Sequence, residues 1–306
     1  MRTRTRLGLA GVVSCAVLVT AVGIGRGDGG DGGGGDGGKP VGPYVALGDS
    51  YTSGPKIPAQ TGTPAGCERS DRNYPALVAR QLKTPLTDVS CSGATLDDLS
   101  AAQDTDDGTN PAQLTALTKD TRLVTLGIGG NDVGFASTIT ECVKLGVRHQ
   151  LESAFRSADA DAPCEKKYDT EVTDKIGALG GKLTRALQEI ERRAPDAKVY
   201  VVGYPEIFPG DDEAASCGGQ LGLAPGDVGF LREQEQRLNS ALRKAASGAG
   251  ASYVDTYRPS EGRGACAAKD VRWVEPLMPT APAAPVHPNE RGEAGMAAAV
   301  LGVVLG

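Results

Sequence analysis

A serine able to act as a nucleophile follows the first apolar run after residue 42. Ser50 lies in the segment GDSYTSG (48–54), directly after the apolar residues 44–47. A serine at the carboxyl end of a strand projects at the rim of a sheet, where its own N–H can face a bound oxyanion. The ordinary alternative is a turn rich in Gly, Asp and Ser. A nucleophilic role for Ser50 therefore requires partner groups elsewhere in the chain.

Two further segments offer hydrogen-bond donors for an oxyanion. Asn131 lies in the glycine-rich segment GIGGNDVGF (127–135), and its neutral amide can stabilise negative charge without being consumed. Gly93 lies in CSGAT (91–95), and its backbone N–H carries no side chain that would obstruct a carbonyl. The alternatives are an Asx turn at Asn131 and a strand-to-helix turn at Gly93. Taken singly, each segment fits either interpretation.

Histidine is the side chain best suited to act as a base near neutral pH, and the chain contains only two. His287 stands just before Pro288, a residue suited to the first turn of a helix. His149 lies among charged residues, and we expect it to be solvated at the surface. His287 is therefore the predicted general base.

The elements that must position these groups alternate along the chain from residue 43. Short apolar runs predict strands, and longer stretches with apolar residues at three- and four-residue spacing predict helices. The predicted strands are 44–47, 88–91, 122–128, 198–202 and 252–255, and the predicted helices are 73–83, 110–118, 170–194, 226–248 and 288–304.

This alternation predicts right-handed βαβ units and a parallel sheet covered on both faces. The candidate groups follow successive strands in the order Ser, Gly, Asn, His, and ligands of such sheets bind outside the carboxyl ends of the strands. We expect three loop-rich segments, 133–170, 205–225 and 258–286, to follow strand ends as well. They are candidates for an apolar cleft beside the nucleophile.

Six cysteines lie outside the N-terminal segment, an even number that is typical of disulfides in an exported protein. Six cysteines allow 15 pairings. Sequence order suggests the pairs Cys67–Cys91, Cys142–Cys164 and Cys217–Cys266. No C-x-x-C pair is present, so the sequence predicts neither a zinc site nor a thioredoxin-like motif.

The N-terminal segment is typical of a secretory signal. Arg2, Arg4 and Arg6 precede an apolar run from Leu7 to Ile24. We therefore predict a signal peptide or N-terminal anchor at 1–25, a flexible Gly/Asp-rich linker at 26–42, and a catalytic domain at 43–306. We expect secretion; the alternative is a protein held at the outer cell surface by an uncleaved anchor.

Composition narrows the classes of partner. The net charge of −6 argues against nucleic-acid binding, which needs a basic face. No P-loop, EF-hand loop or H-E-x-x-H segment is present, so no metal or other cofactor is predicted. We expect a monomer, with a possible membrane tether through the N-terminal segment.

The segments ALGDSYTSG, CSGAT and GIGGND resemble the SGNH (GDSL) hydrolase family, in particular its secreted actinobacterial esterases and lipases. The resemblance spans roughly residues 43–304. It implies a flavodoxin-like three-layer α/β/α sandwich with a five-stranded parallel sheet, and hydrolysis of carboxylic esters with a small-molecule or lipid ester as substrate. It further implies that Ser50 is the nucleophile, that His287 is the base, and that Ser50, Gly93 and Asn131 form the oxyanion hole.

One position departs from the family pattern. Members usually carry Asp three residues before the histidine, and this chain has Ala284 there. Asp270 and Glu275 lie upstream at other spacings. We therefore predict a Ser–His dyad oriented by the main-chain carbonyl of Ala284 or Pro285, which can fix the imidazole tautomer without a carboxylate.

Three functions remain open on these residues. The first is a secreted esterase or lipase acting on lipid or medium-chain acyl esters through an acyl-enzyme. The second is an O-acetyl esterase that deacetylates a polysaccharide or the cell wall. The third is a surface binding protein that keeps the fold without catalysis, which the missing Asp would favour.

Overall fold

The computed structural model describes residues 42–153 and 162–306. The predicted signal peptide or anchor lies outside the described residues, and so does the predicted linker apart from Gly42. The two described ranges cover nearly all of the predicted catalytic domain. Within them, no helix is long and apolar enough to cross a bilayer.

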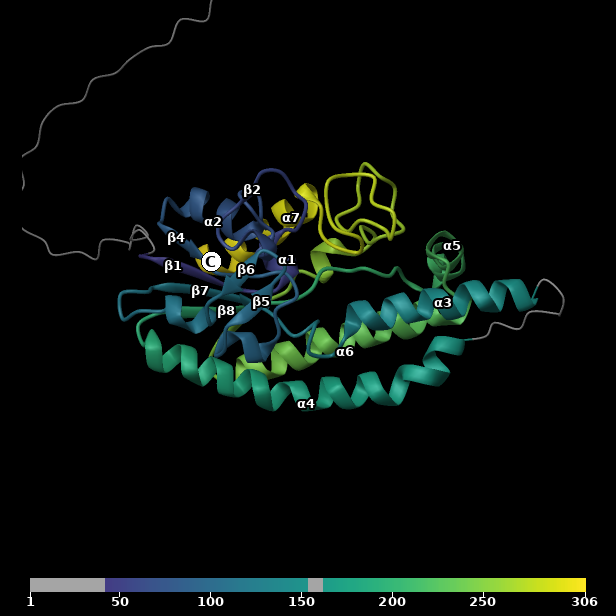
Figure 1. Ribbon diagram of the computed structural model, residues 1–306, viewed down its shortest axis with the longest axis horizontal. Helices are drawn as coiled ribbons and strands as arrows, with labels where there is room; N and C mark the ends of the chain where they lie inside the picture. Colours follow the sequence, from purple (N-terminus) through teal and green to yellow (C-terminus); the bar gives the residue numbers. More distant parts are fainter. Residues whose placement is uncertain (1–41, 154–161) are drawn as a thin grey trace, which may run out of the picture. The chain divides into compact units, whose positions relative to one another are not determined.

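A five-stranded parallel sheet forms the centre of the domain, as predicted (Figure 1). The strands are Tyr44–Gly48 (β1), Leu86–Asp88 (β4), Leu123–Gly127 (β7), Lys198–Val202 (β8) and Ser252–Val254 (β9). Their spatial order is β4-β1-β7-β8-β9, so β1 and β7 lie side by side in the interior of the sheet. Because all five strands run in one direction, their carboxyl ends share one edge.

Three of the five predicted helices form close to their predicted bounds, and a fourth, predicted at 170–194, begins earlier, at Pro163. The described α-helices are Ser50–Ser53 (α1), Tyr74–Leu82 (α2), Phe135–Ser153 (α3), Pro163–Arg193 (α4), Asp211–Leu221 (α5), Pro225–Gly248 (α6) and Glu290–Leu305 (α7). Short 3₁₀ turns lie at Ala65–Cys67, Leu96–Leu99, Gln113–Ala116 and Arg258–Ser260. α7 begins after Pro288, because Asn289 caps it by accepting the N–H groups of Arg291 and Gly292.

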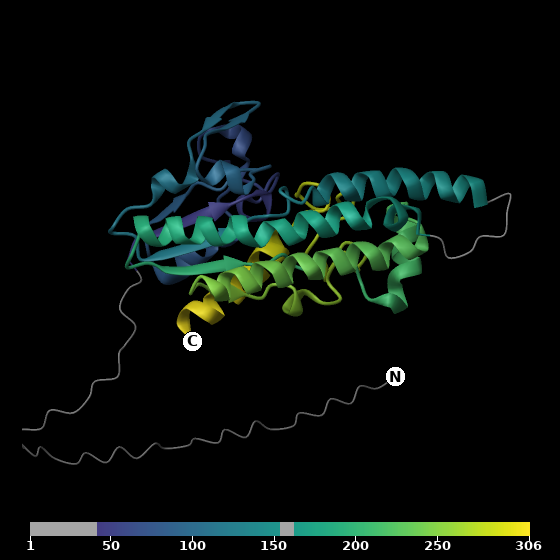
Figure 2. The same cartoon turned by 90° about the horizontal axis from the view of Figure 1, so that it is seen from below.

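Alternate strand residues point to opposite faces of the sheet, and each face is covered by its own helices. Val45 and Leu47 share a buried cluster with residues of α4 and α6, whereas Tyr44 and Ala46 share one with residues of α2 and α7. Figure 1 shows α2 and α7 above the sheet and α4 and α6 below it. Figure 2 shows α4 and α6 running side by side along the lower face. The domain is thus the expected three-layer α/β/α sandwich.

The prediction that 133–170 and 205–225 are loop-rich was wrong. The first segment forms α3 and the start of α4, and the second contains α5. Phe135, Ile139 and Cys142 are buried at helical spacing, which the surrounding Thr and charged residues obscured. α4 begins at Pro163 in a polar turn, earlier than its apolar residues indicated. The segment 258–286, in contrast, contains one short 3₁₀ turn and no α-helix.

The predicted helix at 110–118 was also wrong. Asn110 is the last residue of a short strand, and Gln113–Ala116 form a single 3₁₀ turn. Gln113 is fully buried there, and its amide exchanges hydrogen bonds of 2.8 and 2.9 Å with the backbone of Gly48. This side chain therefore pairs with the end of β1, a long-range contact that helical spacing cannot reveal.

Three disulfides join the cysteines in the pairs that sequence order suggested, Cys67–Cys91, Cys142–Cys164 and Cys217–Cys266. The second joins α3 to α4, and the third joins α5 to the segment that precedes α7. Two short antiparallel ladders complete the described strands, pairing Gln60–Thr61 (β2) with Arg69–Ser70 (β3) and Gln103–Thr105 (β5) with Gly108–Asn110 (β6).

Candidate active site

Ser50 is the first residue of α1 and stands at the carboxyl end of β1. The turn into α1 needs glycine at position 48, because a Cβ there would lie 2.5 Å from the carbonyl oxygen of Gly127. Asp49 caps α1, and its carboxylate accepts the N–H of Tyr51 at 2.9 Å. These contacts fix the backbone on both sides of Ser50 at the rim of the sheet.

The hydroxyl of Ser50 and the imidazole of His287 meet, although 237 positions separate them in the chain. The distance between Nε2 of His287 and Oγ of Ser50 is 2.7 Å. On the other side of the ring, Nδ1 lies 2.7 Å from the carbonyl oxygen of Pro285. A carbonyl can only accept, so Nδ1 carries the proton and Nε2 is free to accept the serine proton.

The loop that carries His287 is held by main-chain hydrogen bonds. The N–H of Glu275 donates to the carbonyl of His287 at 2.9 Å, and the N–H of Val286 donates to the carbonyl of Glu275 at 3.1 Å. Tyr51 adds a side-chain contact, because its hydroxyl donates to the carbonyl of Val286 at 2.5 Å. Its ring also lies 4.9 Å from the imidazole, centroid to centroid. The imidazole of His287 is therefore oriented by backbone and by Tyr51.

The two carbonyls proposed for His287 have different partners. The Pro285 carbonyl accepts from the ring at Nδ1, whereas the Ala284 carbonyl accepts the main-chain N–H of His287 at 3.2 Å. The carboxylate of Glu275 is fully buried and accepts from Asn289 and from the backbone of Thr280 and Ala281. It organises the loop through these contacts, and Asp270 is exposed.

Asn131 and Gly93 reach the same edge of the sheet from β7 and from the segment after β4. The side-chain amide of Asn131 donates to the carbonyl of Ala94 at 2.9 Å, which links the two segments. An amide nitrogen carries two hydrogens, so one remains for a ligand. Both Asn131 and Gly93 line the pocket that contains Ser50 and His287.

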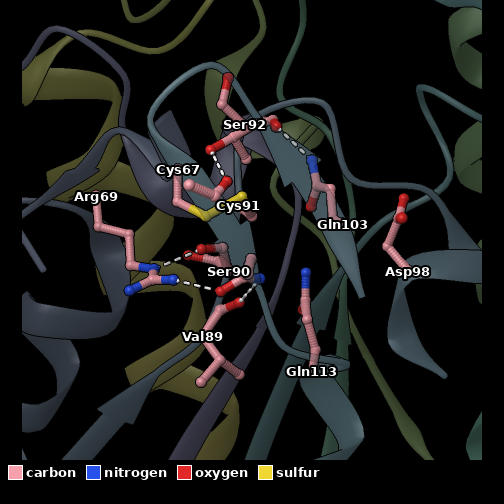
Figure 3. Close-up of a disulfide and its surroundings, with 12 residues drawn as sticks. Cys67, Arg69, Val89, Ser90, Cys91, Ser92, Asp98, Gln103 and Gln113 are labelled. Atoms are coloured by element: carbon pink, nitrogen blue, oxygen red, sulfur yellow. Dashed lines mark hydrogen bonds between the residues drawn. A yellow bond between two sulfur atoms is a disulfide. The ribbon is translucent and has the colours of Figure 1, made fainter. Parts of the chain in front are cut away.

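The segment around Gly93 is held rigidly from both sides. Figure 3 shows the Cys67–Cys91 disulfide at its start, with Arg69 and Gln103 close by. The buried guanidinium of Arg69 donates to the carbonyl of Ser90 at 2.6 Å, and Gln103 donates to the carbonyl of Ser92 at 2.8 Å. Fixed donors stabilise developing charge without reorganising during the reaction.

The pocket beside Ser50 has a volume of about 300 Å³ and an apolar wall. All three segments expected to line a cleft contribute to it, together with α6, which the sequence did not indicate. The apolar residues are Phe135, Ala136, Ile139, Ile207, Leu238, Leu277, Pro285 and Val286. His149 lies on α3, is partly buried, and does not line this pocket.

Comparison with known proteins agrees with this geometry. Residues 46–294 match the model of the GDSL-like lipase/acylhydrolase family. The chain belongs to this family. It is 40% identical over 265 residues to Lipase 2 of Streptomyces coelicolor, a match that covers 85% of this chain and 86% of the relative. As a GDSL hydrolase, it is an esterase or lipase that acts on carboxylic esters.

Two solved structures share the fold of this GDSL hydrolase. One is a phospholipase A1 from Streptomyces albidoflavus, with a TM-score of 0.69 and 29% identity over 86% of this chain and 99% of that one. The other is an extracellular lipase from Streptomyces rimosus, with a TM-score of 0.66 and 27% identity over 85% of this chain and 98% of that one. Both likenesses extend over nearly the whole of those two chains.

The two carboxylates upstream of His287 in the sequence, Asp270 and Glu275, allow a direct test of the carbonyl-oriented dyad in this GDSL hydrolase. Asp270→Asn should leave kcat and stability unchanged, because the side chain is exposed. Glu275→Gln should keep kcat within about threefold but lower the melting temperature by several degrees, since weakening charge-assisted bonds costs about 1–3 kcal/mol. Burial raises the pKa of Glu275, but its hydrogen bonds outweigh burial and hold the pKa below its usual value, so it accepts as a carboxylate. A loss of several orders of magnitude in kcat for either variant would contradict the prediction.

The acid limb of the pH profile should report His287. Burial lowers the pKa of His287, against the raising effect of the Pro285 carbonyl, and only the neutral imidazole accepts a proton. We therefore expect kcat/KM to fall only below pH about 6.5, the ordinary value for histidine. Burial raises the pKa of Asp49 to about 7, so Asp49→Asn is the control. The limb should persist in that variant, and its disappearance would assign the limb to Asp49.

Sequence reasoning missed two tyrosines that contact the dyad or its neighbours. Tyr51 directly follows Ser50, and Tyr204 comes two residues after β8. The rule that located Asn131, a polar side chain just beyond the end of a strand, applies equally to Tyr204.

Proposed function

We propose that this GDSL hydrolase is a secreted lipase or esterase that cleaves esters of medium-length acyl chains through an acyl-enzyme on Ser50. The observation that carries the proposal is the 2.7 Å contact between Ser50 and His287 at the mouth of an apolar pocket. A nucleophile, a base in the correct tautomer and a place for an acyl chain come together there.

Acylation follows from this geometry. Oγ of Ser50 attacks the ester carbonyl carbon while Nε2 of His287 takes the hydroxyl proton. The carbonyl oxygen becomes an oxyanion, for which the N–H groups of Ser50 and Gly93 and the free amide hydrogen of Asn131 are the proposed donors. The tetrahedral intermediate then collapses, and the departing alcohol takes the proton from His287.

Deacylation repeats these steps with water. His287 removes a proton from water, hydroxide attacks the acyl carbon, and the carboxylic acid leaves as Ser50 regains its proton. During both steps the imidazolium is stabilised by the Pro285 carbonyl at Nδ1. A neutral carbonyl stabilises this cation less than a carboxylate does, but it holds the same tautomer and ring orientation.

The apolar wall favours a longer acyl chain over an acetyl group. Phe135 and Ile139 from α3 face the same pocket as Ile207 and Leu238. Each methylene buried against such a wall contributes about 0.8 kcal/mol, or roughly fourfold in binding. The relatives include proteins described as lipases and a phospholipase A1, which supports an acyl-chain substrate.

A series of p-nitrophenyl esters tests this assignment. We expect kcat/KM to rise from acetyl through hexanoyl to about decanoyl esters, and then to fall at palmitoyl once the pocket is filled. In Ile139→Trp, the larger side chain should fill much of the pocket that would hold the acyl chain. It should therefore lower kcat/KM for decanoyl esters at least tenfold more than for acetyl esters, which is about the effect of burying two methylenes. A maximum at acetyl in the wild type would instead identify an O-acetyl esterase.

Export is the second part of the proposal. Three disulfides persist in an oxidising compartment and are rare in the cytosol. The Streptomyces rimosus structure is described as that of an extracellular lipase. We expect the disulfide-bonded protein in the culture supernatant of a natural host, and its N-terminal sequence would show whether residues 1–25 are removed. Protein found only with reduced thiols inside the cell would contradict export.

A further inference from the structure

One buried hydroxyl connects the ends of three neighbouring strands beside the nucleophile. The hydroxyl of Tyr204, which follows β8, donates to the carboxylate of Asp49 at 2.5 Å. The same oxygen accepts the N–H of Gly130, after β7, at 2.8 Å. Asp49 follows β1 and precedes Ser50, and Gly130 precedes Asn131. A single phenol thus bridges the nucleophile turn and the loop that carries the oxyanion donor.

The bridge is close-packed as well as hydrogen-bonded. A Cβ on Gly130 would lie 3.2 Å from the hydroxyl oxygen of Tyr204 and 3.3 Å from the ring carbon that bears it. Glycine at position 130 therefore lets the backbone approach the phenol closely. The ring of Tyr204 also meets the ring of Tyr51 edge to face, with centroids 5.0 Å apart.

Tyr204 is itself fixed by the helix behind it. Asn239 of α6 accepts the backbone N–H of Tyr204 at 2.8 Å and donates to its carbonyl at 3.0 Å. Glu235, one turn earlier, accepts the N–H of Ile207 at 3.0 Å. The segment after β8 is therefore anchored to α6, and Tyr204 extends from this anchor towards β7 and β1.

The electrostatics keep the phenol in its donating form. Burial raises the pKa of Tyr204 well above its usual value, so the hydroxyl stays protonated at any pH where the enzyme would work. Asp49 is 1% exposed and its carboxylate has two donors, Tyr204 and the N–H of Tyr51. Loss of the phenol would leave that buried oxygen without its partner.

We propose that Tyr204 is a positioning residue for the oxyanion hole, holding the Gly130–Asn131 segment at a fixed distance from Ser50. This inference rests on the proposed acyl-enzyme mechanism. The Asn131 amide also donates to the Ala94 carbonyl, and the N–H groups of Gly134 and Phe135 donate to the carbonyls of Asn131 and Gly130, so the loop would stay folded without the phenol but would be less fixed. A loosened donor weakens binding of the transition state more than binding of the ester.

Tyr204→Phe tests the proposal, because it removes one oxygen and keeps the ring. Tyr200→Phe is the matched control: Tyr200 is equally buried on β8, in the cluster on the other side of the sheet. For the preferred p-nitrophenyl ester, Tyr204→Phe should lower kcat about ten- to a hundredfold, less than the 10²–10³ of deleting a donor outright. KM should change less than about twofold, and Tyr200→Phe should match the wild type in both constants.

A second readout separates positioning from general loosening of the fold. A trifluoromethyl ketone adds to a catalytic serine and places an oxyanion in the hole, so its affinity should fall by the same factor as kcat/KM. Gly130→Ala, which puts a methyl group against the phenol, should repeat this pattern and serves if Tyr204→Phe does not fold.

The possible outcomes distinguish a failure of the positioning role from a failure of the acyl-enzyme mechanism. Unchanged kcat and unchanged inhibitor affinity in folded Tyr204→Phe would overturn the positioning role while leaving the Ser50 mechanism intact. A raised KM with normal kcat would show that Tyr204 binds substrate, and would overturn it as well. A wild-type enzyme that the ketone does not inhibit would contradict the acyl-enzyme mechanism, and the inference with it.

Discussion

Ser50→Ala should reduce ester hydrolysis by about 10⁴- to 10⁶-fold in kcat, the range seen when a catalytic serine is removed. The hydroxyl is the atom 2.7 Å from Nε2 of His287, and no other hydroxyl forms a bond with that nitrogen in the described residues. The fold should survive, because Asp49 still caps α1 and only one hydrogen bond is lost. That bond is worth about 1 kcal/mol, so the melting temperature should fall by no more than about 4 °C.

Steady-state assays on the preferred p-nitrophenyl ester, with a melting curve for each protein, check this expectation. Ser53→Ala is the matched control, since this serine lies in the same short helix and its buried hydroxyl has no hydrogen-bond partner among the described residues. A folded Ser50→Ala protein with more than a few per cent of wild-type kcat would show that another residue is the nucleophile.

His287→Ala should produce a loss of similar size, because the serine hydroxyl is a weak nucleophile without a base to take its proton. The double variant should be no worse than either single variant, since residues that act as a unit are not additive. Alanine also leaves a space at the rim beside Ser50. Added imidazole should therefore restore part of the activity of His287→Ala and none of that of Ser50→Ala.

His149→Ala is the control for the loss of a histidine, because the other histidine lies on α3 away from the pocket. It should retain wild-type kcat and KM. A folded His287→Ala enzyme with near-normal activity would contradict the assignment of the base. So would a double variant in which the two losses multiply, because the two groups would then act in separate steps.

Much of the sheet was predictable because local and long-range signals agree there. The strands β1, β7 and β8 are short apolar runs that end in Gly or precede turns. Their residues point alternately to the two faces of the sheet and are buried on both, as is usual in a parallel sheet. The helices α4 and α6 carry apolar residues at helical spacing for several turns. Apart from the polar start of α4, each of these elements keeps one pattern along its length, which is why the layers followed from the sequence.

The failures occurred where a long-range contact decides the structure or where polar residues obscure a local pattern. Gln113 is buried because it pairs with Gly48, and nothing near it in the sequence indicates that contact. Burial by a partner far along the chain overrides local propensity at this place. α3 is amphipathic along its own sequence, but the Thr and charged residues between Phe135, Ile139 and Cys142 obscured their helical spacing.

In the candidate site, too, some features could be predicted from the sequence and others could not. Ser50, Gly93, Asn131 and His287 follow strand ends or precede a helix, so topology alone brings them to one edge. The supporting contacts do not follow from topology. The Pro285 carbonyl at Nδ1, the Tyr51 hydroxyl on Val286 and the Tyr204 bridge depend on loop conformations set by Glu275 and α6.

The most direct measurement is covalent labelling with a fluorophosphonate, followed by mass spectrometry of the tryptic peptides. The probe phosphonylates a serine only when a base has activated it, so labelling reads the contact between Oγ and Nε2 without reference to any natural substrate. The account predicts a single adduct on Ser50 in the wild type, none in Ser50→Ala and a strongly slowed reaction in His287→Ala. An unlabelled wild-type protein, or an adduct at a different serine, would contradict it.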